Sequence, residues 1–206
     1  MFESFKVSAK ALRYSLLFGL MCAVFLSFSD FNAGCEDLRH NILRLHIIAN
    51  SDSVEDQALK LKIRDRILNE SGDIFALSES VDDAVTVAEE QLPALEKIAN
   101  EVIAEEGFDY DAKASVGDGF FETRVYDEFT LPAGRYKSLI INVGESKGKN
   151  WWCVIFPEIC LPAASDRELS DTVNEDGVRI AEDSDRYILR FKVIEIYEDI
   201  KNWLKK

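Results

Sequence analysis

An unbroken run of apolar residues stands out in the second half of the chain. Residues 151–156 are all aromatic, β-branched or small apolar side chains, and they follow a polar Gly-Lys-Asn turn and end at Pro157. Such a run is typical of a strand covered on both faces, because a half-exposed strand alternates apolar with polar residues. Alternate side chains point to opposite faces, so Trp152 is expected to face one covered layer and Cys153 the other. The pattern predicts a central strand.

Three further segments predict strands around it. Residues 42–49 and 139–143 are apolar runs, and residues 112–116 alternate small or apolar side chains with polar ones. The polar loop at 144–150 is short, which favours pairing of 139–143 with the tryptophan strand as an antiparallel hairpin. We therefore expect an antiparallel or mixed sheet.

The helical period recurs in three places. A helix over about 54–70 is expected to begin at Ser53, with Asp56 completing a variant of the capping box, and to end at Gly72. A second amphipathic stretch follows Ser80, where a proline at position 93 predicts a kink or two helices. A terminal helix is expected to dock on the sheet through apolar residues at four-three-four-three spacing, namely Leu189, Val193, Ile196, Ile200 and Trp203.

These elements predict an α+β fold in which a small antiparallel or mixed sheet packs with two to four helices. Residues 38–206 are expected to form one exported domain. Within it, residues 165–186 carry eight acids and three arginines among scattered apolar residues. This composition predicts a solvated loop or disordered linker there.

The first thirty residues predict a targeting segment. Three basic residues precede an uncharged, largely apolar stretch at 14–29, which is the pattern of a signal peptide or a signal anchor. The stretch is shorter than the roughly 20 residues that a stable span requires. Residues 32–35, Asn-Ala-Gly-Cys, share their last three positions with a lipoprotein cleavage box. Cleavage, retention as an anchor and lipidation all stay open.

Charge narrows the range of partners. The 206 residues include 38 acids and 24 bases, a formal net charge of −14. A surface this acidic repels nucleic acid and anionic lipid, so neither is expected as a partner, and membrane contact is expected only through the N-terminal segment.

The cysteines suggest a disulfide but no catalytic centre. Cys153 and Cys160 are close enough along the chain for a bridge, which would contribute roughly 2–3 kcal/mol, while two buried thiols are the alternative. An exported thiol-dependent hydrolase, with either cysteine as nucleophile and His46 as its base, is a second functional hypothesis. The two histidines lack the spacing of metal ligands, and no phosphate-binding glycine loop is present. We expect no cofactor, no metal site and no catalytic residues.

Three blocks of the chain resemble a known family. They are LRLHIIANSDSVEDQALKLKIRD from Leu43, the LPAG turn followed by Tyr136, and GKNWWCVIFPEIC from Gly148. In this order they are similar to the stage II sporulation protein R family of endospore-forming bacteria. The resemblance extends over roughly residues 40–204 and excludes the hydrophobic segment.

The resemblance implies a function that composition does not. Members of this family are made in the forespore and exported into the space between forespore and mother cell, where they trigger a membrane aspartic protease. That protease processes the precursor of the mother-cell sigma factor. The resemblance implies a signalling ligand and not an enzyme, and it supplies no contact residues.

The loop at 144–150 is the segment where we expect the receptor contact. Its ends are held by two apolar strands, and binding residues gather on loops that a rigid scaffold positions. Lys147 and Lys149 add positive charge to an acidic domain, and Asn150 closes the loop. The alternative is a solvated loop with two incidental lysines.

Overall fold

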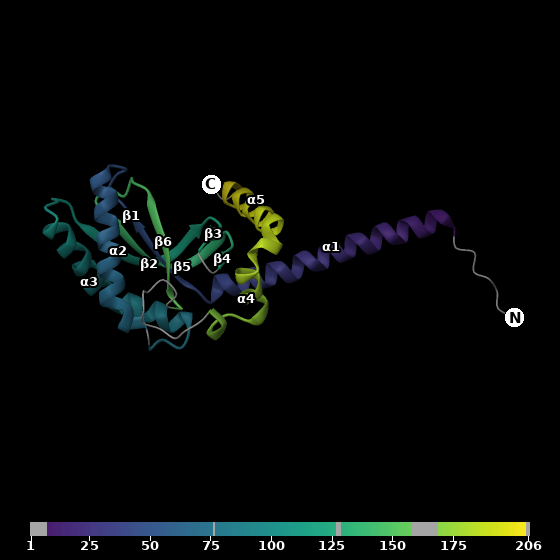
Figure 1. Cartoon of the computed structure of the whole chain (residues 1–206), viewed down its shortest axis with the longest axis horizontal. Helices are drawn as coiled ribbons and strands as arrows, with labels where there is room; N and C mark the ends of the chain where they lie inside the picture. Colours follow the sequence, from purple (N-terminus) through teal and green to yellow (C-terminus); the bar gives the residue numbers. More distant parts are fainter. Residues whose placement is uncertain (1–7, 76, 127–128, 158–168, 205–206) are drawn as a thin grey trace.

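The computed structural model describes residues 8–75, 77–126, 129–157 and 169–204 (Figure 1). Its helices are α1 (Ala9–His40), α2 (Val54–Phe75), α3 (Val81–Glu105), α4 (Glu175–Glu182) and α5 (Ile188–Leu204), with 3-10 helices η1 (Leu169–Asp171) and η2 (Ser184–Tyr187). Its strands are β1 (Leu43–Ile48), β2 (Ala112–Phe121), β3 (Arg124–Val125), β4 (Thr130–Leu131), β5 (Gly134–Val143) and β6 (Asn150–Phe156).

The main sheet is mixed and has the strand order β2-β5-β1-β6. β1 and β5 are parallel, whereas β2–β5 and β1–β6 pair antiparallel. The predicted α+β class with a mixed sheet is confirmed. Two details of the prediction are wrong: β5 and β6 do not form a hairpin, and the tryptophan strand β6 lies at the edge of the sheet.

β1 takes the central position because its side chains are buried on both faces. Leu43, Arg44, Leu45 and Ile47 are all fully buried. β6 is also covered on both faces, but only one of its edges is paired, because it is the last strand of the sheet. The predicted alternation of side chains between the two faces of β6 is confirmed for Cys153 and Val154, which pack into separate core clusters on opposite faces of the sheet.

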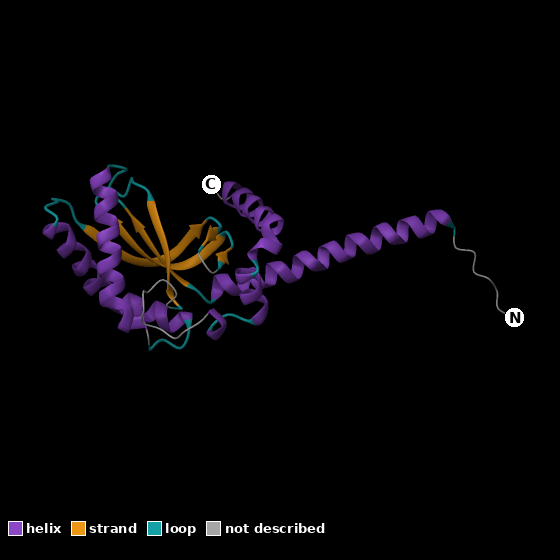
Figure 2. Ribbon diagram, viewed as in Figure 1, coloured by secondary structure: helices purple, strands orange, loops and turns teal. Residues whose placement is uncertain are grey.

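Helices cover the two faces of the sheet (Figure 2). α2 and α3 cover one face and form a core cluster with the inward side chains of all four strands. The C-terminal part of α1, together with α4, α5 and the β3–β4 ribbon, forms a second cluster on the other face. The domain therefore consists of three layers.

Ser53 caps α2 and Ser80 caps α3 as predicted, but Asp56 does not complete a capping box, because Ser53 N–H donates to Ser51 Oγ at 3.1 Å. α2 is longer than predicted. Ser53 Oγ accepts the backbone N–H of Asp56, and Ser80 Oγ accepts that of Asp83. α2 continues through Gly72 to Phe75, whose side chain is buried. α3 is one helix through Pro93, because buried residues on both sides of the proline hold it against the sheet.

The acidic segment predicted as a loop over 165–186 is helical where the structure describes it. Residues 169–187 form η1, α4 and η2. The scattered apolar residues share one side of these short helices, where Leu169, Val173 and Ile180 are buried against α1 and the second cluster. The prediction was wrong because these contacts come from α1, which is distant in sequence.

α1 is continuous from the apolar targeting segment into the folded domain. Its N-terminal part is exposed and projects from the domain (Figure 1), and an 18-residue window within the helix has a mean hydropathy of 1.8 and is 0% buried. Phe31, Cys35 and Leu38, near its C-terminal end, are buried in the second cluster. By length and composition α1 is able to cross a membrane, which is compatible with a signal or a membrane anchor.

The terminal helix forms as predicted, but a different face docks. α5 buries Phe191 and Ile194, whereas Leu189 and Trp203, at the ends of the predicted docking stripe, are 82% and 75% exposed. The four-three-four-three spacing of apolar residues correctly predicted an amphipathic helix, but the prediction of which face packs against the domain was wrong.

Candidate interaction site

Two connections meet where the parallel strands β1 and β5 end. Residues 49–53 lead from β1 into α2, and residues 144–149 lead from β5 across the end of β1 into β6. Because the carboxyl ends of parallel strands lie at one edge of a sheet, the two loops are brought together there. We call this surface, formed by residues 49–53, 144–150 and Tyr110, the edge site.

The second loop is fixed to the first by backbone hydrogen bonds. Lys147 N–H donates to the Asn50 carbonyl at 3.1 Å, and Gly148 N–H donates to the Ala49 carbonyl at 2.9 Å. A Cβ at Gly148 would lie 2.2 Å from the Ser51 carbonyl oxygen, so only glycine permits this approach. The loop at 144–150 is therefore fixed to residues 49–51 and crosses the end of β1.

Side chains extend this attachment. The Asn50 side-chain oxygen accepts Glu145 N–H at 2.9 Å, and Asp52 Oδ1 accepts Lys149 N–H at 2.7 Å. Beneath the loop, Lys60 is 4% exposed and its ammonium donates to the Lys149 carbonyl at 2.9 Å. Burial lowers the pKa of Lys60, with a smaller opposing contribution from the charge of Asp52.

Asp56, in the first turn of α2, lies beneath the edge site and is 6% exposed. Its Oδ2 accepts Asn50 Nδ2 at 2.9 Å and Ser51 Oγ at 2.5 Å, and its Oδ1 accepts the hydroxyl of Tyr110. Tyr110 comes from the connection between α3 and β2. One carboxylate thus joins three segments of the chain.

The pKa values follow from this arrangement. Burial alone raises the pKa of Asp56, but the hydrogen bonds from Ser51, Tyr110, Asn50 and Ser53 outweigh it, and the pKa lies below its usual value. Burial, the hydrogen bond to Asp56 and its negative charge raise the pKa of Tyr110 well above its usual value. Asp56 is therefore an anion and Tyr110 a neutral donor at neutral pH.

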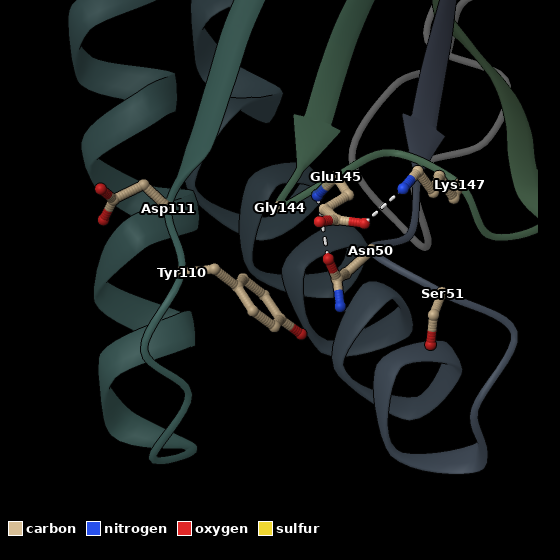
Figure 3. A pocket seen from close by; sticks show the side chains of 7 residues that line it. All are labelled: Asn50, Ser51, Tyr110, Asp111, Gly144, Glu145 and Lys147. Atoms are coloured by element: carbon tan, nitrogen blue, oxygen red, sulfur yellow. Dashed lines mark hydrogen bonds and ion pairs between the residues drawn. The ribbon is translucent and has the colours of Figure 1, made fainter.

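A hollow with a volume of about 490 Å³ opens beside this network. It is lined by Asn50, Ser51, Tyr110, Asp111, Gly144, Glu145 and Lys147. Figure 3 shows Tyr110 pointing towards Asn50 across the hollow, with Glu145 and Lys147 on its rim. The lining residues include no thiol and no imidazole. The hollow offers a fixed set of hydrogen-bonding groups, which suits recognition better than bond breaking.

The structure brings together the three residues predicted for the receptor contact. Lys147, Lys149 and Asn150 are all exposed on the rim of the edge site. Lys147 forms an ion pair with Glu145 at 2.7 Å, so the positive potential expected from two lysines is partly offset. That these residues contact a receptor stays a prediction.

Of the two cysteines considered as nucleophiles, Cys153 does not lie beside His46, the base considered for it. Cys153 pairs in register with Leu45 and His46 with Trp152, so Cys153 and His46 face opposite sides of the sheet. His46 instead stacks on Trp152, with ring centroids 4.1 Å apart. Burial lowers the pKa of His46, and the charge of Arg44 lowers it further, against a hydrogen bond with Asn150. Cys160 lies outside the described residues, so the predicted disulfide stays a prediction.

A buried cation connects β1 with the LPAG turn. Arg44 is fully buried, donates from Nη2 to the Tyr126 hydroxyl at 2.6 Å, and places its guanidinium 4.1 Å from the Phe121 ring and 5.0 Å from the Tyr136 ring. The Tyr136 hydroxyl donates to the Pro132 carbonyl at 2.7 Å. Arg39 of α1 binds the Ala133 carbonyl through Nε and Nη2. The block that begins at Leu43 therefore meets the LPAG block in this buried cluster and the block that begins at Gly148 in the edge site.

Sequence reasoning missed Tyr110 and the central role of Asp56. The spacing of Ser53 and Asp56 predicted the start of α2. Asp56 stands where a capping box usually has the longer glutamate, and this difference was the available signal that its carboxylate bonds to other groups nearby. Tyr110 had no such signal, because its approach depends on how α3 returns to the sheet.

Comparison with known proteins identifies relatives by sequence. The family model described as stage II sporulation protein R matches residues 39–166. The chain is 32% identical over 158 residues to stage II sporulation protein R of Bacillus subtilis (strain 168), covering 77% of this chain. The aligned part spans 66% of the Bacillus subtilis protein, just under two thirds of its length. No solved structure matches the chain.

Proposed function

This chain belongs to the stage II sporulation protein R family, and from that membership we propose that it is an exported signal of endospore formation. In this role it triggers a membrane aspartic protease, which then processes the precursor of the mother-cell sigma factor. The chain acts as a ligand and not as an enzyme. Its place of action is the space between forespore and mother cell.

The edge site is the observation that carries this proposal. A ligand that acts by contact requires a surface whose shape is set before binding, because ordering a flexible loop on binding costs free energy. The crossover at 144–150 is pinned to residues 49–53, and the Asp56 network fixes those residues from below. Residues 49–53 and 148–150 belong to the blocks that resemble the family. We therefore place the receptor contact on Lys147, Lys149 and Asn150.

The hydrolase hypothesis has less support. Cys153 is buried in the cluster beneath α2 and α3, on the face of the sheet opposite to His46. A nucleophile and its base must lie within hydrogen-bond reach, which that arrangement does not allow. The edge site contains neither residue.

The test replaces Lys147 and Lys149 together by serine. Exposed loop charges contribute little to folding, so the melting temperature should stay nearly unchanged. Processing of the sigma precursor, followed by immunoblot in sporulating cells that make only the variant, should fall. The exported amount of the variant is measured in the same cells.

The matched control replaces Lys62 and Lys97 by serine. These lysines are also exposed, at 54% and 76% of the side chain, and lie on α2 and α3. The control removes the same charge from the layer formed by α2 and α3, and processing of the sigma precursor should stay normal in cells that make it. Normal processing by the Lys147 and Lys149 variant, when folded and exported, would exclude these lysines as the contact.

A further inference from the structure

α5 exposes an apolar stripe that the domain leaves uncovered. Val193, Ile196 and Ile200, between the more exposed Leu189 and Trp203, are 47%, 58% and 54% exposed. Tyr197 and Leu204 widen the same side of the helix, at 58% and 71% exposure. Single exposed apolar residues are ordinary, but a contiguous stripe along a whole helix marks an interaction surface.

The first turn of α5 is held beside the end of the apolar part of α1. Arg190 Nη2 donates to Ser27 Oγ at 2.6 Å. The Phe31 ring stacks on Tyr187 at 5.3 Å and meets Phe191 edge-on at 5.4 Å. The uncharged stretch of α1 ends at Ser29, so the end of the part of α1 that is able to cross a membrane lies next to α5. Figure 1 shows α5 at the end of the domain from which α1 projects.

The charge of this segment differs from that of the rest of the chain. Residues 188–206 contain five Lys or Arg and three Asp or Glu, whereas residues 1–187 contain 19 bases and 35 acids. α5 itself carries three bases and three acids, so it lacks the net negative charge of the rest of the chain. An amphipathic helix with Trp and Tyr beside its apolar residues is the pattern of a helix that lies in a membrane interface. A second copy is disfavoured as the occupant, because it would bring two acidic domains together.

We propose that α5 lies on the surface of the membrane that α1 crosses, with the stripe from Leu189 to Trp203 among the lipid chains. Membrane contact then involves two helices from opposite ends of the chain. A single spanning helix leaves the domain free to rotate about its axis, and the second contact fixes that rotation. The orientation of the edge site above the membrane follows from it.

The proposal requires the chain to keep the whole of α1. Gly34 lies against α4 so closely that a Cβ there would be 2.5 Å from Ile180 Cδ1. Cys35 is fully buried, which is a poor position for a lipidated N-terminus. Processing before Cys35 would also remove Ser27 and Phe31, and with them the contacts that hold α5. These contacts support retention of the segment as an anchor.

The test uses the full chain in lipid nanodiscs containing phosphatidylglycerol, with lipids brominated near the headgroup end of the acyl chains. The difference in fluorescence between the chain and its Trp203→Phe variant isolates the emission of Trp203 from that of the other two tryptophans. We expect brominated lipid to quench most of this emission and aqueous iodide to quench little of it. The readout does not involve sigma processing, so it stands or fails separately from the proposed signalling role.

Paired variants check that the stripe causes the contact. Val193→Glu with Ile200→Glu places two charges on the stripe and should make Trp203 accessible to iodide. Leu77→Glu with Val54→Glu adds the same charge at positions that are 88% and 81% exposed, near the two ends of α2 in the layer on the other face of the sheet, and should leave lipid quenching unchanged.

Two results would overturn the proposal. One is a Trp203 that iodide quenches and brominated lipid does not, which would leave a protein partner as the occupant of the stripe. The other is protection from both quenchers that disappears on dilution together with a dimer seen by light scattering, which would show that a second copy covers it.

Discussion

Replacing Asp56 by asparagine tests whether one carboxylate holds the edge site together. The variant keeps the shape of the side chain and the backbone hydrogen bond to Ser53, but an NH₂ group takes the place of one acceptor oxygen. This NH₂ group, a hydrogen-bond donor, then faces either the donor groups of Asn50 and Ser51 or the hydroxyl of Tyr110, and no hydrogen bond forms between two donors. A hydrogen bond to a charged group contributes about 1.5–3 kcal/mol, and bonds that share one carboxylate do not add fully. We expect a loss of about 2–4 kcal/mol in the free energy of unfolding.

The pH dependence of this loss has a definite sign. The pKa of Asp56 is lower in the folded chain than its value of about 3.9 in an unfolded chain, because its hydrogen bonds outweigh the effect of burial. The stability that it contributes is therefore complete above that unfolded value and is lost as the pH falls through the folded pKa. Asparagine does not titrate. The stability difference between the chain and the variant should thus be constant from about pH 5 to 7 and shrink below about pH 4.

Urea unfolding in mild detergent, followed by tryptophan fluorescence, measures both effects. Asp65→Asn is the control, because Asp65 lies on the same helix and its side chain is 57% exposed; we expect it to change stability by less than about 0.5 kcal/mol. An Asp56→Asn variant as stable as this control at pH 7 would contradict the reasoning. So would a large loss that stays the same at pH 7 and pH 3.5, since that would locate its cause outside the ionised carboxylate.

Two further substitutions test the packing on the second face of the sheet. Trp152→Ala should cost about 1–3 kcal/mol in urea melts, less than the 3–5 of a fully buried tryptophan, because Trp152 is only partly buried. Removing the ring exposes His46, so its pKa, followed by NMR, should rise towards its usual value. Gly34→Leu should cost about 1–3 kcal/mol by forcing α1 away from α4, and a variant as stable as the parent would show that the two helices are not in close contact.

The sequence predicted which segments form helices and strands better than it predicted which elements lie next to each other. An apolar run shows that both faces of a strand are covered, and this was correct for β6. It carries no information about whether both edges are paired, so β6 was taken for a central strand although β1 separates it from β5. The helical segment around Ile180 was missed for a related reason, because its buried residues contact α1 from a distant part of the chain.

The candidate site was predictable only in part. The loop with Lys147 and Lys149 was found from its turn residues and flanking strands, and the capping pair at the start of α2 from its spacing. Joining the two required the parallel pairing of β1 with β5, which brings their carboxyl ends to one edge. Tyr110 completes the network from a connection whose sequence has no distinguishing pattern.

The two proposed surfaces place a geometric demand on the receptor. From Ser29, where the uncharged stretch ends, α1 continues for eleven residues to His40, a rise of about 16 Å, and β1 then runs from the end of α1 towards the edge site. Its six residues add about 20 Å. The edge site can therefore stand up to about 36 Å from the membrane surface, as an upper bound for collinear elements. A receptor that binds it needs an element reaching that distance outside the bilayer, whereas contacts confined to its spanning helices would meet only α1 and α5.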